Sequence, residues 1–105
     1  MAQSEILDDS LEILDCLDRG FSRFGQSVGN VVYWKFQFTT KLSKLEVTKR
    51  PDLFSLTIQE IFREGGKIVE NALIQELKVK FQIADRNYAG LEDAMNSIKT
   101  RSFQN

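Results

Sequence analysis

Large apolar residues recur every three or four positions through the first third of the chain, and this spacing constrains the fold more than any other feature. The successive spacings are 4, 3, 3, 4, 3, 4 and 3. They belong to Leu7, Leu11, Leu14, Leu17, Phe21, Phe24, Val28 and Val31. Such a repeat is typical of one face of an amphipathic α-helix. A glycine costs a helix interior about 1 kcal/mol relative to alanine. Gly20, Gly25 and Gly29 therefore predict a break near Gly20 to Gly25, and two helices rather than one.

Residues 31–40 fit two kinds of secondary structure. Apolar residues alternate with other residues, which favours a strand; they are Val32, Trp34, Phe36 and Phe38. The helical repeat also continues through this segment, at Val31, Trp34, Phe38, Leu42 and Leu45. The sequence contains no second convincing strand, and a lone strand would leave its backbone groups unpaired. We therefore predict a helix here.

The rest of the chain carries helix signals of its own. We predict a connection at residues 43–50, after which Pro51 suits the first turn of a new helix. Gly65 and Gly66 separate that helix from the next. The next helix has a stripe of apolar residues four positions apart, namely Val69, Leu73, Leu77 and Phe81.

These elements predict an all-α fold, a compact bundle of four or five helices in a single domain over residues 1–105. An N-terminal helix is expected at residues 1–20, and a short C-terminal helix at residues 90–103 follows a turn. The helices between them occupy residues 25–83.

The titratable residues exclude several kinds of site. The chain has no histidine, which excludes imidazole metal ligands and Ser-His-Asp triads within it. Cys16 is the only cysteine, and its apolar surroundings favour a small hydrophobic side chain over a reactive thiol. Asp8, Glu12 and Asp15 share one helical face, which we interpret as a solvated acidic face rather than a metal site. We expect no catalytic residues, no cofactor and no metal.

Charge is unevenly distributed although the net charge is only −1. Residues 1–30 carry six acidic and two basic residues, a net charge of −4. Residues 31–50 carry five basic residues and one acidic residue, a net charge of +4. If the two stretches fold back on each other, their opposite charges can lie side by side.

Two groups of residues are candidate binding surfaces. The first is an aromatic group in a segment that is apolar on more than one helical face, which is typical of an interface; it comprises Tyr33, Trp34, Phe36 and Phe38. The second is a basic group near these aromatic residues, a composition used for contacts to nucleic acid; it comprises Lys35, Lys41, Lys44, Lys49 and Arg50.

An ordered run of features extends over residues 25–83. They are Phe24-Gly25 at the start of a helix that continues to Val32-Tyr33-Trp34, Pro51 with Phe54, Ile61-Phe62, Gly65-Gly66, and Ile68-Val69-Glu70 leading to Ile74 and Glu76-Leu77. This order resembles the small archaeal Nitrosopumilus output domain family. Arg63 stands where a glycine is expected after Ile61-Phe62. The resemblance implies a helical domain, alone or attached to sensory modules, that serves signalling or regulation, and it implies no catalytic residues.

We therefore expect a non-enzymatic regulatory or protein-interaction domain that binds a protein partner, or itself as a homodimer, through an apolar helical surface. A nucleic-acid-binding domain that uses the basic stretch at residues 35–50 is the alternative, and a small-molecule sensor is a further one. No secretory segment or membrane span is evident in the sequence. Together with the lone thiol, this favours a cytoplasmic location.

Overall fold

The computed structural model describes the backbone of residues 2–104 and the side chains of residues 10–100. Over the described backbone the chain forms five α-helices, two short 3-10 helices and no strand. The elements are α1 (Ala2–Ser22), α2 (Val28–Thr40), η1 (Lys44–Thr48), α3 (Pro51–Phe62), η2 (Arg63–Gly65), α4 (Gly66–Phe81) and α5 (Leu91–Gln104). The all-α prediction is confirmed, and so is the choice of helix over strand for residues 31–40.

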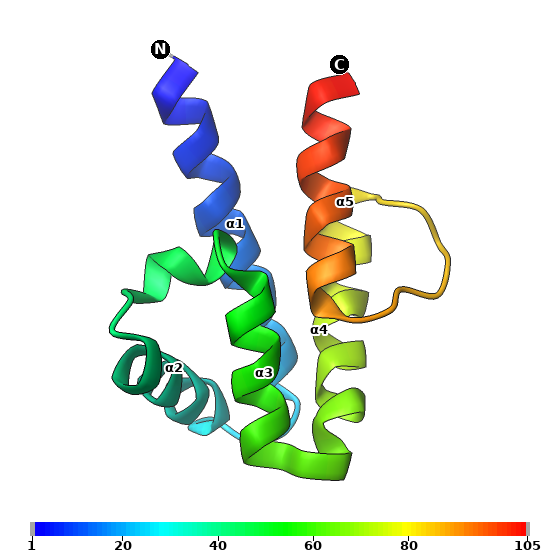
Figure 1. Ribbon diagram of the computed structural model, residues 1–105. Coiled ribbons are helices and arrows are strands. Elements are labelled where there is room, and N and C mark those ends of the chain that lie inside the picture. The colour runs from blue at the N-terminus through cyan, green and yellow to red at the C-terminus, as the bar shows by residue number, and fades with distance from the viewer. Residues whose placement is uncertain (1, 105) are drawn as a thin grey trace.

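The helices are arranged around an antiparallel pair formed by α1 and α4 (Figure 1). α3 packs against α4, and α2 and η1 lie on the opposite side of the molecule from α5. The loop at residues 82–90 returns along the outside, so that α5 runs in the same direction as α4. As a result, the N-terminal end of α1 and the C-terminal end of α5 point the same way.

One core joins all five helices, and its centre is aromatic. Phe54 of α3 contacts three other rings, with centroid separations of 5.6 Å to Tyr33, 5.6 Å to Phe36 and 6.1 Å to Phe21. The predicted stripe on α4 faces this core, and all four of its residues are buried. Complete burial of a Leu or Phe side chain contributes about 1.5–3 kcal/mol relative to exposure. These side chains therefore hold the bundle together.

The predicted break between the first two helices exists, but Gly20 does not cause it. α1 continues through Gly20 to Ser22, and α2 begins at Val28. Gly20 lies where α1 crosses α4, and a Cβ atom at this position would be 2.5 Å from Leu73 Cδ2 and 3.1 Å from Leu73 Cα. The glycine thus permits a close helix crossing. The chain turns instead at Gly25, whose φ of 141° is accessible to glycine alone without strain.

The segment at residues 43–50 is more than the connection that we predicted, because it contains η1. Val47 is completely buried, and Thr48 Oγ1 lies 3.2 Å from Ser10 Oγ and donates to the Leu45 carbonyl at 3.1 Å. Glu46 Oε2 accepts a hydrogen bond from the Ser43 backbone N–H at 3.5 Å. η1 is therefore anchored to α1, which brings part of the basic stretch beside the acidic one.

Candidate functional site

The inner face of α2 belongs to the core, which corrects part of the predicted aromatic surface. Tyr33 and Phe36 are 3% and 0% exposed, so neither is available to a partner. The Tyr33 hydroxyl donates a 2.8 Å hydrogen bond to Asp18 Oδ1, and Lys44 Nζ lies 4.3 Å from the centre of the Tyr33 ring. Burial, and then the hydrogen bond to Asp18, raise the pKa of Tyr33 above its ordinary value. This face packs α2 against α1, η1 and α3.

The outer face of α2 carries a ridge of exposed apolar side chains, Val31, Trp34 and Phe38, which we call the α2 ridge. Trp34 is 61% exposed and Phe38 is 59% exposed. Their rings stack on each other, with centroids 5.1 Å apart and an interplanar angle of 11°. Lys41 Nζ lies 4.9 Å from the centre of the Phe38 ring. Two of the four aromatic residues that we predicted as an interface thus form a preorganised apolar surface.

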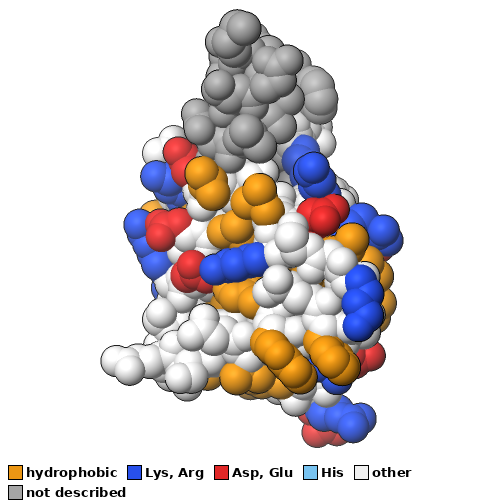
Figure 2. Space-filling model, turned by 90° about the vertical axis from the view of Figure 1, so that its left-hand side faces the viewer, with side chains coloured by type: hydrophobic (Ala, Val, Ile, Leu, Met, Phe, Trp, Pro, Cys, Tyr) orange, Lys and Arg blue, Asp and Glu red, His pale blue; other side chains and the backbone are white. Residues whose placement is uncertain are grey.

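α2 has a ridge because it is apolar on two opposite faces. The residues that continue the helical repeat of α1 are those of the ridge, and they face away from the core. The bend at Gly25 reorients the helix, so the repeat of α1 no longer predicts which face of α2 is buried. Figure 2 shows the side of the molecule that α2 and η1 border, with hydrophobic side chains gathered along its lower part.

Two of the five residues in the predicted basic group are already paired with carboxylates. Lys44 pairs with Asp18 at 4.0 Å, and Arg50 donates to both carboxylate oxygens of Asp52, at 3.2 and 3.0 Å. The hydrogen bond to Asp52 raises the pKa of Arg50. The remaining three, Lys35, Lys41 and Lys49, have no ion-pair partner among the described side chains. Lys35 is half-buried and the other two are exposed.

A shallow groove lies between α1 and η1, and sequence reasoning missed it. Its volume is about 550 Å³. Its lining comprises Leu11, Leu14, Asp15, Asp18, Ser43, Lys44 and Leu45. Leu11 and Leu45 are 59% and 40% exposed, so the groove presents apolar surface to solvent. We call it the α1–η1 groove. The sequence signal that could have found it is the apolar repeat, which continues to Leu45.

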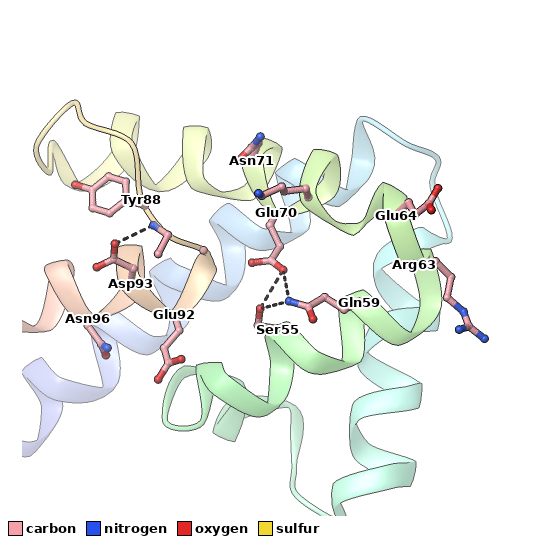
Figure 3. Close-up of a pocket in the computed structure, with 13 residues that line it drawn as sticks. Ser55, Gln59, Arg63, Glu64, Glu70, Asn71, Tyr88, Glu92, Asp93 and Asn96 are labelled. Carbon is pink, nitrogen blue, oxygen red and sulfur yellow. Dashed lines mark hydrogen bonds between the residues drawn. The ribbon is translucent and has the colours of Figure 1, made fainter.

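A second depression, between α3, α4 and the start of α5, is polar (Figure 3). Its volume is about 570 Å³, and Glu70 of α4 lies at its base with only 5% exposure. Glu70 Oε2 accepts hydrogen bonds from Ser55 Oγ at 3.0 Å and Gln59 Nε2 at 3.4 Å, and Oε1 accepts one from the Leu91 backbone N–H at 2.8 Å. Both carboxylate oxygens therefore have protein partners.

The other wall of this polar depression is also internally paired. Arg86 donates to both oxygens of Asp93, at 3.2 and 3.3 Å, and this lowers the pKa of Asp93. Asp93 Oδ2 also accepts the Ala89 backbone N–H at 3.0 Å. Arg63 and Glu64, at the opposite rim, point away from Glu70 in Figure 3. These bonds hold the loop at residues 82–90 against α5, and the depression has a clear structural role.

Two further groups from the sequence lie elsewhere. Of the acidic face, Asp8 lies outside the described side chains, Glu12 is exposed, and Asp15 pairs with Arg19 at 2.8 Å. The described side chains contain no group of three or more residues suited to hold a metal ion. Cys16 is 1% exposed, and burial raises the pKa of its thiol to about 11. This agrees with a hydrophobic packing role for Cys16.

Comparison with protein-family models, with curated proteins and with solved structures found no match for this chain. The resemblance to the Nitrosopumilus output domain family therefore stays a prediction. In the part of the chain that the structure describes, none of the helices has the length and apolar character needed to span a bilayer.

Proposed function

We propose that the chain is a non-enzymatic protein-interaction domain with a regulatory role, and that the α2 ridge is its docking surface. The observation that carries the proposal is the stacked pair of Trp34 and Phe38, which are exposed together on one helix face. Large exposed aromatic side chains are enriched at protein interfaces and dominate their binding energy. The stack also fixes both rings before binding, which lowers the entropy lost when a partner docks.

The charges beside the ridge indicate the chemistry of the partner. α2 contains no acidic residue, and Lys35 and Lys41 are without an ion-pair partner among the described side chains. A complementary segment has apolar residues at helical spacing and acidic residues at its edges. We therefore propose an acidic amphipathic helix as the occupant of the ridge.

This function is favoured over nucleic-acid binding because only three of the five basic residues lack an ion pair among the described side chains. Lys44 and Arg50 are already paired with carboxylates, and releasing them toward phosphates would sacrifice those contacts. A buried lone thiol supports a reducing environment and hence a cytoplasmic location. The signalling role follows from the family resemblance.

The proposal can be tested with a displayed library of helical peptides in which the flanking charges vary. Wild-type protein and the double variant Trp34→Ala/Phe38→Ala serve as targets, with Leu56→Ala as the matched control, because Leu56 is exposed to a similar degree on α3. We expect enrichment of peptides with apolar anchors and acidic flanks on the wild type and the control only. Equal enrichment on the double variant, or none on the wild type, overturns the proposal.

A parallel titration with single-stranded oligonucleotides at low and high salt addresses the alternative. Binding that weakens steeply with salt would indicate contacts to phosphates. If such binding is present and the peptides are not enriched, the basic stretch is the functional surface instead.

A further inference from the structure

We infer that the partner of the α2 ridge is a second copy of this chain, whose α1–η1 groove receives the ridge. This inference rests on the proposed function and identifies the acidic amphipathic helix as α1 of the second copy, which forms one wall of the groove. In a symmetric dimer, the ridge of each copy would lie in the groove of the other. Such a closed arrangement contains two equivalent contacts.

Unused charge complementarity within the chain is the first support. The stretches at residues 1–30 and 31–50 carry net charges of −4 and +4. Among the described side chains, a single ion pair joins them, Asp18 with Lys44 at 4.0 Å. Glu12 on α1 and Lys35 and Lys41 beside the ridge have no ion-pair partner within that part of the structure. Among the described side chains, the charges of Glu12, Lys35 and Lys41 are therefore available to a second copy.

The shapes of the two surfaces are the second support. The ridge is an exposed pair of stacked rings on the outer face of a helix, whereas the groove is concave and presents Leu11 and Leu45 to solvent. Asp15 and Asp18 also line the groove, together with Lys44. They pair with Arg19 and Lys44, but their side chains stay 57% and 49% exposed, so a lysine beside the ridge of a second copy can reach them. Residues that dominate the binding energy of an interface, tryptophan among them, lie in well-packed pockets near its centre.

The placement of the two surfaces allows a reciprocal dimer. η1 follows directly on α2, and both border the side of the molecule shown in Figure 2. On this side, one gathering of hydrophobic side chains lies near the grey end and another along the lower edge, with oppositely charged side chains between them. Because the ridge and the groove belong to neighbouring elements, a two-fold axis between two copies can bring the ridge of each copy against the groove of the other.

Sedimentation velocity on the full chain, from micromolar to millimolar concentration, tests this inference. We expect the wild type to dimerise, and we expect its dissociation constant to rise with salt. The ridge variant Trp34→Ala/Phe38→Ala and the groove variant Leu11→Asp/Leu45→Asp are each expected to be monomeric. Leu56→Asp, with its exposed leucine on α3, is the control and should dimerise like the wild type.

Mixing the two variants provides the decisive measurement. The ridge variant keeps its groove and the groove variant keeps its ridge, so a mixed dimer retains one of the two contacts. We expect the mixture to form a heterodimer weaker than the wild-type dimer, although neither variant dimerises alone. A circular dichroism spectrum for each variant confirms that it is folded.

Three outcomes overturn the inference. They are a wild type that stays monomeric at millimolar concentration, a dimer that persists in either double variant, and a mixture that shows no heterodimer. A monomeric wild type that still enriches acidic helical peptides through its ridge would refute self-association and leave the proposed function standing. Failure of both experiments would refute both.

Discussion

The Glu70 carboxylate accepts the backbone N–H of Leu91 at 2.8 Å, and this bond joins the middle of the chain to the first residue of α5. The N-terminal end of a helix has unpaired N–H groups and a partial positive charge, which a carboxylate stabilises. Because Ser55 and Gln59 donate to the same carboxylate, Glu70 links three helices. It also lies close to Gly90, where a Cβ atom would be 3.3 Å from Oε1.

Replacing Glu70 with alanine should therefore lower the free energy of unfolding by about 2–3 kcal/mol, because it leaves the buried Leu91 N–H unpaired and removes the hydrogen bonds from Ser55 and Gln59. Glu70→Gln should cost less, since the amide oxygen can accept the Leu91 N–H and its NH2 group can donate to Ser55 Oγ. Urea unfolding measures both values. Hydrogen exchange should show that the amides of α5 lose protection first in the alanine variant. Equal losses for the two variants would contradict this role.

The helices of this fold were predictable from the sequence, because α1 and α4 each carry a single apolar stripe at helical spacing. The structural role of Glu70 was not predictable, because Glu70 lies on the buried side of α4, where the local pattern alone predicts an apolar residue. Its partners come from α3 and α5, and such tertiary contacts leave no local signal. Likewise, the sequence showed that residues 31–40 are apolar on more than one helical face, but only the direction of the helix after Gly25 decides that Trp34 is exposed.

Gly20 permits the close crossing of α1 and α4, so Gly20→Ala should destabilise the protein. Alanine improves helix propensity by about 1 kcal/mol, but its Cβ atom would contact the Leu73 backbone, which has little freedom to move. Overpacking of this kind costs about 1–3 kcal/mol. We expect a net loss, measured as a lower midpoint of urea unfolding.

Gly65→Ala is the matched control for that substitution. Gly65 has a negative φ, and the nearest atom to an added Cβ is Phe62 Cβ at 4.0 Å. Its midpoint should equal or exceed that of the wild type. A Gly20→Ala protein as stable as this control would show that the crossing does not depend on glycine.

Arg63 stands where a glycine was expected, and the backbone conformation at this position explains why glycine would suit it. Its φ of 56° and ψ of −121° lie in a region that favours glycine. Strain of this kind costs about 1–3 kcal/mol. The Arg63 side chain is exposed and makes no ion pair with the described residues. Arg63→Gly should therefore stabilise the protein by about 1 kcal/mol. Arg63→Ala, which keeps a Cβ atom, should show no gain, and a similar gain in both variants would contradict the explanation.

Stability should fall at alkaline pH because the Cys16 thiol is buried. Burial raises its pKa from 9.0 to about 11 in the folded protein. Between these values the unfolded chain has lost the thiol proton while the folded chain retains it, so deprotonation favours unfolding. The stability that depends on the protonated thiol is fully present below pH 9 and is lost as the pH rises through about 11.

Urea unfolding at a series of pH values measures the slope of stability against pH. Cys16→Ala should flatten it over this interval, whatever the variant does to stability at neutral pH. The phenol of Tyr33 also has a raised pKa, so Tyr33→Phe should flatten only the part of the stability curve above pH 10. An unchanged slope in Cys16→Ala would show that the thiol does not titrate in this range.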